Sequence, residues 1–600
     1  MARDAHVSEL DSARALAPGA HADAHGTTFV VLATRPSSVA VRLCDDRGRP
    51  VRTVPLDRQD AEHAGRFARR IDGVLDGTLY DFVLDGEPTP DPYARFLPLG
   101  VHGPARVTSA RRLAPLPEPP ALHRWSVYEL HVGTFSPEGT FRGALSRLDH
   151  LVDLGVTAIE LLPIAAFDGA RGWGYDGVAL YAPHAPYGDP DDLRALVEGV
   201  HARGLAVIVD AVFNHLGPSG NYLARYAPEY FTSKVQTPWG DSPDFTWEPM
   251  RQLVLGSARR WLDDFGVDAL RLDATHAVHD ASPRHILREI ADLAHALGRT
   301  VFFEDERNEP DVLDGLAADA VWADDFHHQV HALVTGERDG YYAAYEPTVR
   351  ALAANIERGW TYEGQPYAPW RGRPRGKPAR GIARERLVTC IQNHDQVGNR
   401  ALGQRLSALC DLDAYAAAAM LALFVPSTPV LFMGQEWAAS TPFLYFTDHG
   451  GELGASVSRG RREEFASFSA FADPALRERI PDPEAASTFE ASRLRWEERE
   501  SADGARVLDL HRAMLRLRRT DPVLSQACRD DELTATETRD GVLEVTRRRG
   551  ADARRLVVNF GAHDAPFTRP PDARVLLATG RRADATLPPH AALLLALGPG

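Results

Sequence analysis

The chain has 600 residues and a formal net charge of −16, a negative field that would repel nucleic acid and anionic membranes, so a neutral substrate is more compatible. Hydrophobic residues make up 44% and charged residues 25% of the chain, which is typical of globular proteins, and this length indicates two to four domains. Because no run approaches the roughly 20 apolar residues that span a bilayer and no apolar leader opens the chain, we expect a soluble, cytoplasmic protein.

The first part of the chain reads as a short tail followed by a β-domain. Residues 1–20 show no sustained period and are predicted to form a mobile tail. Between residues 21 and 110, short runs such as T-F-V-V-L-A and T-L-Y-D-F-V-L alternate with Gly, Asp and Pro clusters, which predicts an antiparallel β-sandwich. The Pro-rich stretch Asp85–Phe96 would either clamp this sandwich onto the next domain or act as a plain linker.

In the middle of the chain, predicted strands alternate with predicted helices. From Trp125 onward, eight strand-like runs alternate with amphipathic helical patterns, so residues 111–505 are predicted to form a closed (β/α)8 TIM barrel. An open doubly wound sheet would normally carry G-x-G-x-x-G after its first strand, and the sequence has none there. Residues 506–600 are predicted to hold an Arg-rich helix that closes the barrel, at Leu508–Leu524, and a small antiparallel β-domain. The predicted fold class is therefore α/β.

Four acidic residues terminate strand-like runs, where catalytic groups lie in such barrels. They are Asp210, Asp273, Glu304 and Asp395, and each alone could be a helix-cap or loop acid. Carboxylates crowded at one mouth push their pKa values apart, which separates an acid from a nucleophile, as cleavage of a glycosidic bond requires. Arg271 precedes Asp273 by two residues on the same strand face, so its charge should keep Asp273 ionised, although a surface ion pair is the alternative.

Four segments in order resemble the signature segments of the α-amylase superfamily of glycoside hydrolases: Asp210–His215, Arg271–His276, Glu304 closing V-F-F-E, and Asn393–Asp395. The resemblance implies that Asp273 is a nucleophile that forms a covalent glycosyl-enzyme. It also implies that Glu304 is the general acid and then the base. This two-step route would retain the anomeric configuration, with the two carboxyl groups roughly 5 to 5.5 Å apart.

The same resemblance implies roles for the neighbouring residues. Asp395 would hold sugar hydroxyls, Arg271 would fix Asp273, and Tyr175 in the G-W-G-Y-D-G segment would lie under the reacting sugar, with Trp173 as a packing residue. His215 and His394 would donate to hydroxyls of the cleaved sugar, unless they are structural histidines.

Two further residues, Asp210 and Asn214, would support these groups without touching the substrate.

Several other stretches resemble one subfamily, the malto-oligosyltrehalose trehalohydrolases, among them A-D-D-F-H-H-Q, I-Q-N-H-D-Q-V-G-N-R and M-G-Q-E-W. This resemblance implies hydrolysis of the α-1,4 bond next to a terminal trehalose unit of malto-oligosyltrehalose, and functional pairing with a malto-oligosyltrehalose synthase. The alternative is a 1,4-α-glucan branching enzyme, which transfers the glycosyl group to a sugar hydroxyl. A non-catalytic glucan-binding protein is disfavoured, because it needs no acid and nucleophile together.

The loop after the sixth strand is the predicted discriminator of trehalose. Asp324, Asp325, His327 and His328 supply several donors and acceptors there, and Asp325 is the first candidate because a carboxylate can accept two sugar hydroxyls. His328 is also a candidate substrate-binding residue. The alternative is that Asp324 or Asp325 caps the following segment.

No metal or cofactor is expected from the sequence. No D-x-D-x-D-G calcium loop occurs, and the four cysteines lie far apart, without the spacing of metal ligands.

Overall fold

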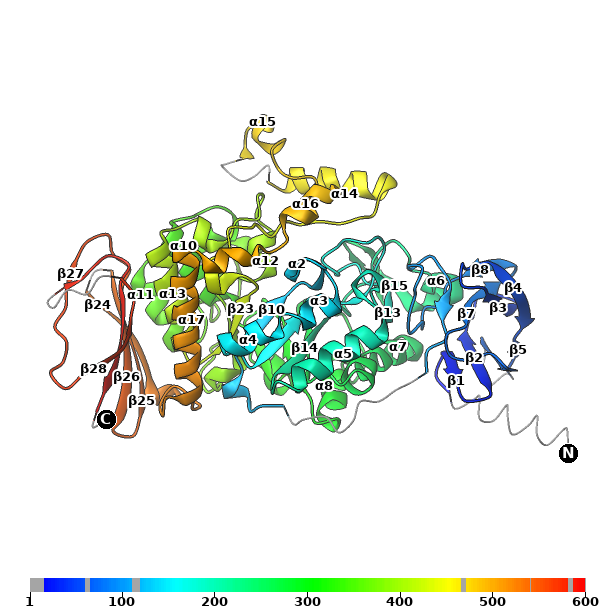
Figure 1. Ribbon diagram of the computed structural model, residues 1–600, viewed down its shortest axis with the longest axis horizontal. Helices are drawn as coiled ribbons and strands as arrows, with labels where there is room; N and C mark the ends of the chain where they lie inside the picture. Colours follow the sequence, from blue (N-terminus) through cyan, green and yellow to red (C-terminus); the bar gives the residue numbers. More distant parts are fainter. Residues whose placement is uncertain are drawn as a thin grey trace.

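The computed structural model describes residues 16–59, 65–109, 119–465, 471–539, 541–580 and 586–598. The molecule is elongated, with a barrel between an N-terminal and a C-terminal β-region (Figure 1). Residues 1–15 of the predicted tail lie outside the described residues. Strand β1 (Gly19–Ala22) begins within residues 1–20, so the predicted tail is wrong for its last two residues.

Two antiparallel sheets form the N-terminal region, which confirms the predicted β-rich domain. One sheet has the strand order β1-β2-β6-β5 and the other β4-β3-β7-β8, with β9 also paired to β7. Large apolar side chains from both sheets fill the space between them. The strands after β1 are β2 (Gly26–Leu32), β3 (Val39–Cys44), β4 (Pro50–Pro55), β5 (Asp57–Arg58), β6 (Arg66–Asp72), β7 (Leu79–Leu84), β8 (Glu87–Thr89) and β9 (Ala105–Arg106).

The Pro-rich exit from this region packs directly on the barrel. The hydroxyl oxygens of Tyr93 and Tyr230 lie 3.0 Å apart, and Tyr226 donates to the carbonyl oxygens of Thr89 and Pro90 at 3.2 and 2.9 Å. Tyr226 is also part of the N-terminal hydrophobic core. The stretch is therefore a clamp and not a plain linker.

Eight parallel strands close into the predicted barrel, in the order β10-β11-β14-β17-β18-β19-β22-β23, with β23 pairing back to β10. Their runs are apolar because helices cover the outside and side chains fill the inside. The strands are β10 (Val127–Leu130), β11 (Ala158–Leu161), β14 (Ala206–Ala211), β17 (Ala269–Leu272), β18 (Thr300–Phe303), β19 (Ala320–Trp322), β22 (Leu387–Thr389) and β23 (Thr428–Phe432).

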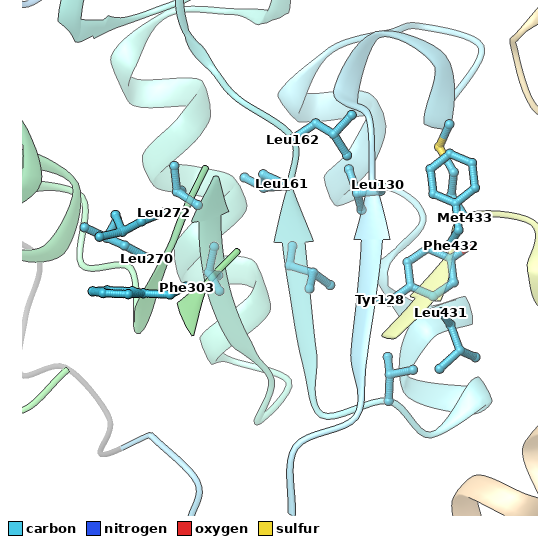
Figure 2. Close-up of a cluster of buried hydrophobic side chains, with 14 of the residues drawn as sticks. Tyr128, Leu130, Leu161, Leu162, Leu270, Leu272, Phe303, Leu431, Phe432 and Met433 are labelled. Atoms are coloured by element: carbon cyan, nitrogen blue, oxygen red, sulfur yellow. The ribbon is translucent and has the colours of Figure 1, made fainter. Parts of the chain in front are cut away.

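Strand periodicity decides which residues enter the barrel. Leu270 and Leu272 of β17 belong to the core cluster that extends to the surrounding helices (Figure 2), whereas Ala269 packs in the cluster inside the barrel. Because side chains alternate along a strand, Arg271 shares the inward face of Ala269. The same alternation turns Glu129 of β10 inward, between Tyr128 and Leu130.

Helices and short strands occupy the connections of the barrel. The stretch predicted as a loop after the sixth strand is instead the first turn of α10. The principal elements are β12 (Ala165–Ala166), β13 (Ala179–Pro183), α5 (Pro190–His201), α6 (Leu223–Tyr226), β15 (Phe231–Thr237), β16 (Gly240–Pro243), α7 (Glu248–Arg259), α8 (Ile286–Ala296), α10 (Asp324–Thr335), η7 (Gly340–Ala344), α11 (Val349–Arg358), β20 (Pro366–Tyr367), β21 (Arg373–Pro374), α12 (His394–Gly398) and α13 (Leu412–Phe424).

After β23 the chain makes an excursion, which we call the arm, at the described residues 438–465 and 471–491. It carries α14 (Gly451–Glu464), α15 (Pro474–Arg477) and α16 (Ala486–Ala491), which project from the barrel (Figure 1). Helix α17 (Ala502–Thr520) overlaps the predicted closing helix, but it begins and ends earlier than the predicted Leu508–Leu524 and starts inside the range predicted for the barrel.

A C-terminal β-region follows α17 (Figure 1), as predicted. Its five-stranded antiparallel sheet has the order β24-β25-β26-β30-β28, and β27 pairs with β29. The strands are β24 (Leu533–Arg539), β25 (Val542–Arg549), β26 (Asp552–Asn559), β27 (Ala565–Pro566), β28 (Arg574–Ala578), β29 (Thr586–Leu587) and β30 (Ala592–Leu597). Among the described residues, none of the helices has both the length and the apolar character needed to cross a membrane.

Candidate active site

The carboxylates predicted from strand ends meet at one mouth of the barrel. Asp210 lies on β14, Asp273 directly follows β17, Glu304 directly follows β18, and Asp395 lies in the first turn of α12, after β22. These are the carboxyl ends of the strands, where groups from different strands converge.

One guanidinium, that of Arg271, joins three of these carboxylates. Its Nη1 donates to both oxygens of Asp210 and to Oδ1 of Asp273, and its Nη2 donates to Oε2 of Glu304, all at 2.8 Å. The Arg271 side chain is 1% exposed. The alternative of a surface ion pair is therefore wrong.

The surroundings of Asp273 lower the pKa of its carboxyl group. Asn214 donates from Nδ2 to Asp273 Oδ2 at 2.7 Å and to its carbonyl oxygen at 3.0 Å. Burial opposes the charge of Asp273, but Arg271 and the hydrogen bond from Asn214 outweigh it and lower its pKa. Asn214 thus contacts this carboxylate directly, and its role as a supporting residue stays a prediction.

The surroundings of Glu304 raise the pKa of its carboxyl group. Burial raises its pKa well above the usual value, Arg271 opposes this rise, and the charges of Asp273 and Asp395 add to it. The backbone N–H of Ala274 donates to Glu304 Oε2 at 2.8 Å, from a left-handed residue with a φ of 41°. The pKa values of the two acids are therefore shifted in opposite directions.

His394 makes its hydrogen bonds to protein groups. Its Nδ1 lies 2.6 Å from Glu129 Oε1, its backbone N–H donates to Glu129 Oε2 at 2.9 Å, and its Nε2 lies 2.7 Å from the Tyr175 hydroxyl. Burial opposes a charge on His394, but the carboxylates of Asp395 and Glu129 raise its pKa to about 10. The imidazolium faces Asp395, with its Nε2 3.6 Å from Oδ1. Both ring nitrogens are engaged, so the predicted donation to sugar is not available in this arrangement.

Tyr175 links the two halves of the site. Its hydroxyl donates to Asp210 Oδ2 at 2.6 Å, and its ring stacks on His394 with the centroids 5.2 Å apart. Burial raises the pKa of Asp210 to about 6, against the opposing charge of Arg271. Trp173 packs on Phe443 instead, at 5.2 Å, and is buried. Tyr175 thus remains the candidate for the floor of the sugar site.

Both ring nitrogens of His215 contact protein groups. Its Nδ1 contacts Asn214 Oδ1 and its Nε2 lies 2.8 Å from the carbonyl oxygen of Tyr175, so neither ring nitrogen is free for the predicted sugar contact. Its ring stacks on Trp239, with the centroids 3.6 Å apart. Trp239 stands at the β15–β16 hairpin and is 41% exposed, a residue that sequence reasoning missed although P-W-G marks a turn.

The prediction that Asp325 binds a sugar is wrong, because its carboxylate is fully buried and occupied by protein donors. Its side chain also does not cap α10. Instead it fastens a later segment to the barrel, accepting hydrogen bonds from Arg375 Nη1 (2.8 Å), Asn308 Nδ2 (2.8 Å), the Tyr345 hydroxyl (2.5 Å) and the backbone N–H groups of Thr361 (2.7 Å) and Tyr362 (3.1 Å).

His328 is also nearly buried. Its Nδ1 lies 2.5 Å from the carbonyl oxygen of Asp324, and its ring contacts that of Tyr341 with the centroids 4.5 Å apart. Burial lowers the pKa of His328 to about 4, so the ring is neutral. Its role towards the substrate stays a prediction.

Two acids that sequence reasoning missed lie deeper in the barrel. Glu129 of β10 and Glu160 of β11 are register partners, and both are buried. Burial and the charge of Glu129 raise the pKa of Glu160 to about 8. A glutamate at the inward position of an otherwise apolar strand was the available signal.

Within the described ranges, no group of three or more His, Cys, Asp or Glu side chains is arranged to hold a metal ion. The four cysteines are free thiols.

The chain is similar to known proteins along most of its length. The α-amylase catalytic domain matches residues 109–234, and a domain of unknown function matches residues 531–594. A malto-oligosyltrehalose trehalohydrolase of Deinococcus radiodurans is 49% identical over 86% of this chain and 87% of its own length. The chain belongs to the malto-oligosyltrehalose trehalohydrolase family.

Two further proteins are similar to this chain to different extents. The crystal structure of a Salmonella typhimurium protein assigned as an α-amylase superposes with a TM-score of 0.87, at 36% identity, over 97% of this chain and 99% of that one. A 1,4-α-glucan branching enzyme of Rhodococcus jostii is 32% identical over only 42% of this chain and 36% of its own length. The similarity to the trehalohydrolase therefore extends over twice as much of the chain.

Proposed function

We propose that the protein is a retaining glycoside hydrolase that cleaves the α-1,4-glucosidic bond next to the terminal trehalose of malto-oligosyltrehalose and releases trehalose. Family membership supports the choice of substrate. The observation that carries the chemistry is the pair Asp273 and Glu304, joined by Arg271, in which the pKa of one carboxyl is lowered and that of the other is raised.

In the first step, the proton of Glu304 passes to the glycosidic oxygen while a carboxylate oxygen of Asp273 attacks the anomeric carbon. The bond to trehalose breaks, and an ester between the sugar and Asp273 forms. Arg271 holds Asp273 in place and compensates the negative charge left on Glu304.

In the second step, Glu304 is a carboxylate and takes a proton from water, whose oxygen attacks the anomeric carbon. The ester breaks, Asp273 is released, and two inversions give net retention. Asp395, whose side chain is 36% exposed, is placed to accept hydrogen bonds from sugar hydroxyls, with the His394 imidazolium beside it. The ring of Tyr175 supplies the apolar floor.

The substrate and the compartment follow from the same proposal. A glucan ending in trehalose must be supplied by an enzyme that rearranges the reducing end of a malto-oligosaccharide, so functional pairing with a malto-oligosyltrehalose synthase is part of it. A cytoplasmic location is supported by the four free cysteines, which suit a reducing compartment.

The test is to incubate the protein with maltotriosyltrehalose and, separately, with maltopentaose, and to identify the products. We expect trehalose and maltotriose from the first substrate, at a much higher kcat/KM than any cleavage of the second. The variant Asp273→Asn is the control for contaminating activity. New α-1,6 branches on amylose would favour the branching enzyme, and binding without any product would favour a non-catalytic glucan-binding protein.

A further inference from the structure

His215 lies between two hydrogen-bond acceptors of the active site. Its Nε2 lies 2.8 Å from the carbonyl oxygen of Tyr175, and its Nδ1 contacts Oδ1 of Asn214. The residue is 4% exposed, so solvent has little access to the ring. These contacts place His215 between the candidate floor of the sugar site and the amide that bonds to the nucleophile.

The orientation of the Asn214 amide follows from its other hydrogen bonds. Its Nδ2 donates to Oδ2 and to the carbonyl oxygen of Asp273, at 2.7 and 3.0 Å. A flipped amide would place Oδ1 against these two oxygens, and neither a carboxylate nor a backbone carbonyl can donate to it. The oxygen end of Asn214 therefore faces His215 and can only accept.

Both neighbours of the imidazole nitrogens are thus acceptors. A neutral imidazole carries a single N–H, so it satisfies one acceptor and turns a lone pair toward the other. An imidazolium has an N–H on each nitrogen and satisfies both. The charged ring is therefore the form of His215 that fits the positions of Tyr175 and Asn214.

The face of the ring also has a neighbour that suits a cation. Trp239 stacks on His215 with the centroids 3.6 Å and the planes 14° apart, and the face of an indole is electron-rich. Trp239 Nε1 donates to Oδ1 of Asp176 at 3.2 Å, so a carboxylate stands at the edge of the indole. His449 of the arm approaches the same carboxylate, with its Nε2 3.4 Å from Oδ2.

Two carboxylates act on the charge of His215: Asp273 after β17, and Asp176 between β12 and β13. Burial lowers the pKa of His215, whereas these two charges and the hydrogen bond to the Tyr175 carbonyl raise it. Burial raises the pKa of Asp273, and the charge of His215 acts with Arg271 to lower it. The double contact of the ring is therefore complete at low pH, and one half of it is lost as the pH rises through the pKa of His215.

We propose that His215 is a positioning residue that works as an imidazolium and clamps the amide of Asn214 to the backbone of Tyr175. The clamp fixes the nucleophile relative to the floor of the sugar site, and its charge favours the ionised nucleophile. The inference rests on the proposed function for its effect on catalysis. The charge of the ring does not depend on a substrate.

The test uses variants of the full-length protein. His215→Gln is neutral and carries both of its N–H groups on one nitrogen, so it cannot replace the two ring nitrogens. His215→Asn, a smaller neutral amide, takes its place if His215→Gln fails to fold. His25→Gln, at an exposed histidine of the N-terminal region, is the matched control.

NMR of the protein with isotope-labelled histidine detects the charge, and the signals of His215 are those missing from the variant. At the pH of maximal kcat/KM we expect N–H protons on both ring nitrogens of His215, each exchanging slowly with water because it is hydrogen-bonded and buried. Asp176→Asn keeps an acceptor for the indole but removes a negative charge, so it should lower the pKa of this titration. A single N–H on His215 at that pH would overturn the inference.

The pH profile of kcat/KM separates a charged clamp from a merely structural histidine. In His215→Gln the loss of a positive charge should move the acid limb, which reports Asp273, to higher pH by at least about half a unit. We also expect kcat to fall about tenfold. His25→Gln should change neither quantity, and a lower kcat with an unmoved acid limb would contradict the proposal.

Failure of the proposed function is distinguishable from failure of the clamp. If the wild type cleaves maltopentaose and releases no trehalose, the choice of substrate fails, and the same pH profiles with maltopentaose test the clamp. If neither substrate is cleaved, the NMR experiment decides at acidic pH. Two slowly exchanging N–H protons on His215 would then support the imidazolium, and one or none would exclude it.

Discussion

Asp273 and Glu304 share one cation, but their pKa values are shifted in opposite directions. Both contact Arg271 at 2.8 Å, yet Asn214 adds a hydrogen bond to Asp273 only, whereas Glu304 also faces the charges of Asp273 and Asp395. Burial raises the pKa of both carboxyls, and the neighbours decide the outcome: Arg271 and Asn214 outweigh burial at Asp273, whereas the charges of Asp273 and Asp395 add to it at Glu304.

At these two residues we predict that Asp273→Asn and Glu304→Gln each lower kcat by several orders of magnitude. The first variant loses the attacking oxygen charge and the second loses the transferable proton. Both changes keep the side-chain volume, so the circular dichroism spectrum and Tm should stay close to those of the wild type. Turnover near the wild-type rate in either variant would contradict the assignment.

The opposite pKa shifts predict a broad pH optimum. Activity needs Asp273 ionised and Glu304 protonated, so kcat/KM should fall as pH drops through the lowered pKa of Asp273 and as pH rises through the raised pKa of Glu304. With ordinary values of about 3.9 and 4.3, almost no such window would exist. A pH profile of kcat/KM checks this, and a narrow optimum near these ordinary values would speak against the pair.

Glu129 is predicted to be a positioning residue that acts through His394. In Glu129→Gln the ring loses its ionic partner, so the pKa of His394 should fall and the ring should lose its charge at a lower pH. We expect kcat/KM to drop about tenfold, with a new loss of activity on the alkaline side. Titration of the His394 imidazole by NMR tests this directly, and an unchanged imidazole titration would exclude the role.

At the scale of elements, one buried carboxylate holds a whole excursion of the chain. Asp325 in the first turn of α10 binds Arg375 and the backbone of Thr361 and Tyr362, and so ties the segment around β20 and β21 to the barrel. The position looks like a recognition site in sequence because the stretch is rich in polar residues. In the structure the carboxylate of Asp325 instead forms hydrogen bonds to the segment 361–375.

We therefore predict that Asp325→Ala lowers the free energy of unfolding by roughly 3 to 5 kcal/mol, because Arg375 is left buried without its partner. The ratio of kcat/KM for maltotriosyltrehalose to that for maltopentaose should stay constant. Denaturant unfolding and the two assays measure this. Asp314→Ala, whose side chain is 87% exposed, is the matched control and should change stability by less than about 0.5 kcal/mol. A changed ratio with unchanged stability would restore the recognition role.

Helix α17 shows the same effect of tertiary context. Its arginines look like a solvated face, but Arg518 is buried and donates to the carbonyl oxygens of Leu423, Val425 and Ser427. Because these carbonyls lie in the last turn of α13 and directly after it, the arginine satisfies backbone acceptors that the end of the helix leaves open. It thereby fastens α17 to the barrel.

At the scale of the whole molecule, the N-terminal region and the barrel share a hydrophobic core. Val178, Ala179 and Ala182, in and next to β13, and Tyr226 of α6 lie in the same cluster as the apolar side chains of the N-terminal sheets. Ordinary interdomain contacts are more polar, so these two regions should unfold together.

We predict that Tyr226→Ala lowers the free energy of unfolding by about 3 to 5 kcal/mol, because it opens a cavity at this shared core and removes two hydrogen bonds. Leu75→Ala, at a residue that is 44% exposed, should have little effect. Calorimetry of both variants is the measurement. A separate low-temperature transition for the N-terminal region would mean that the shared core does not couple the two regions.

The sequence by itself determined the elements and the positions of the principal acids. Alternating strand and helix periods specify the barrel, and a strand end specifies where Asp273 and Glu304 stand, because both signals are local and depend on neighbours a few residues away. Tertiary structure alone decided how the remaining polar side chains are used. Glu129 meets His394 across 265 positions only because β23 pairs back to β10 and closes the barrel. Asp325 cannot bind the substrate because the segment 361–375 covers it and donates hydrogen bonds to its carboxylate. The donors to a buried carboxylate depend on packing and not on spacing along the chain.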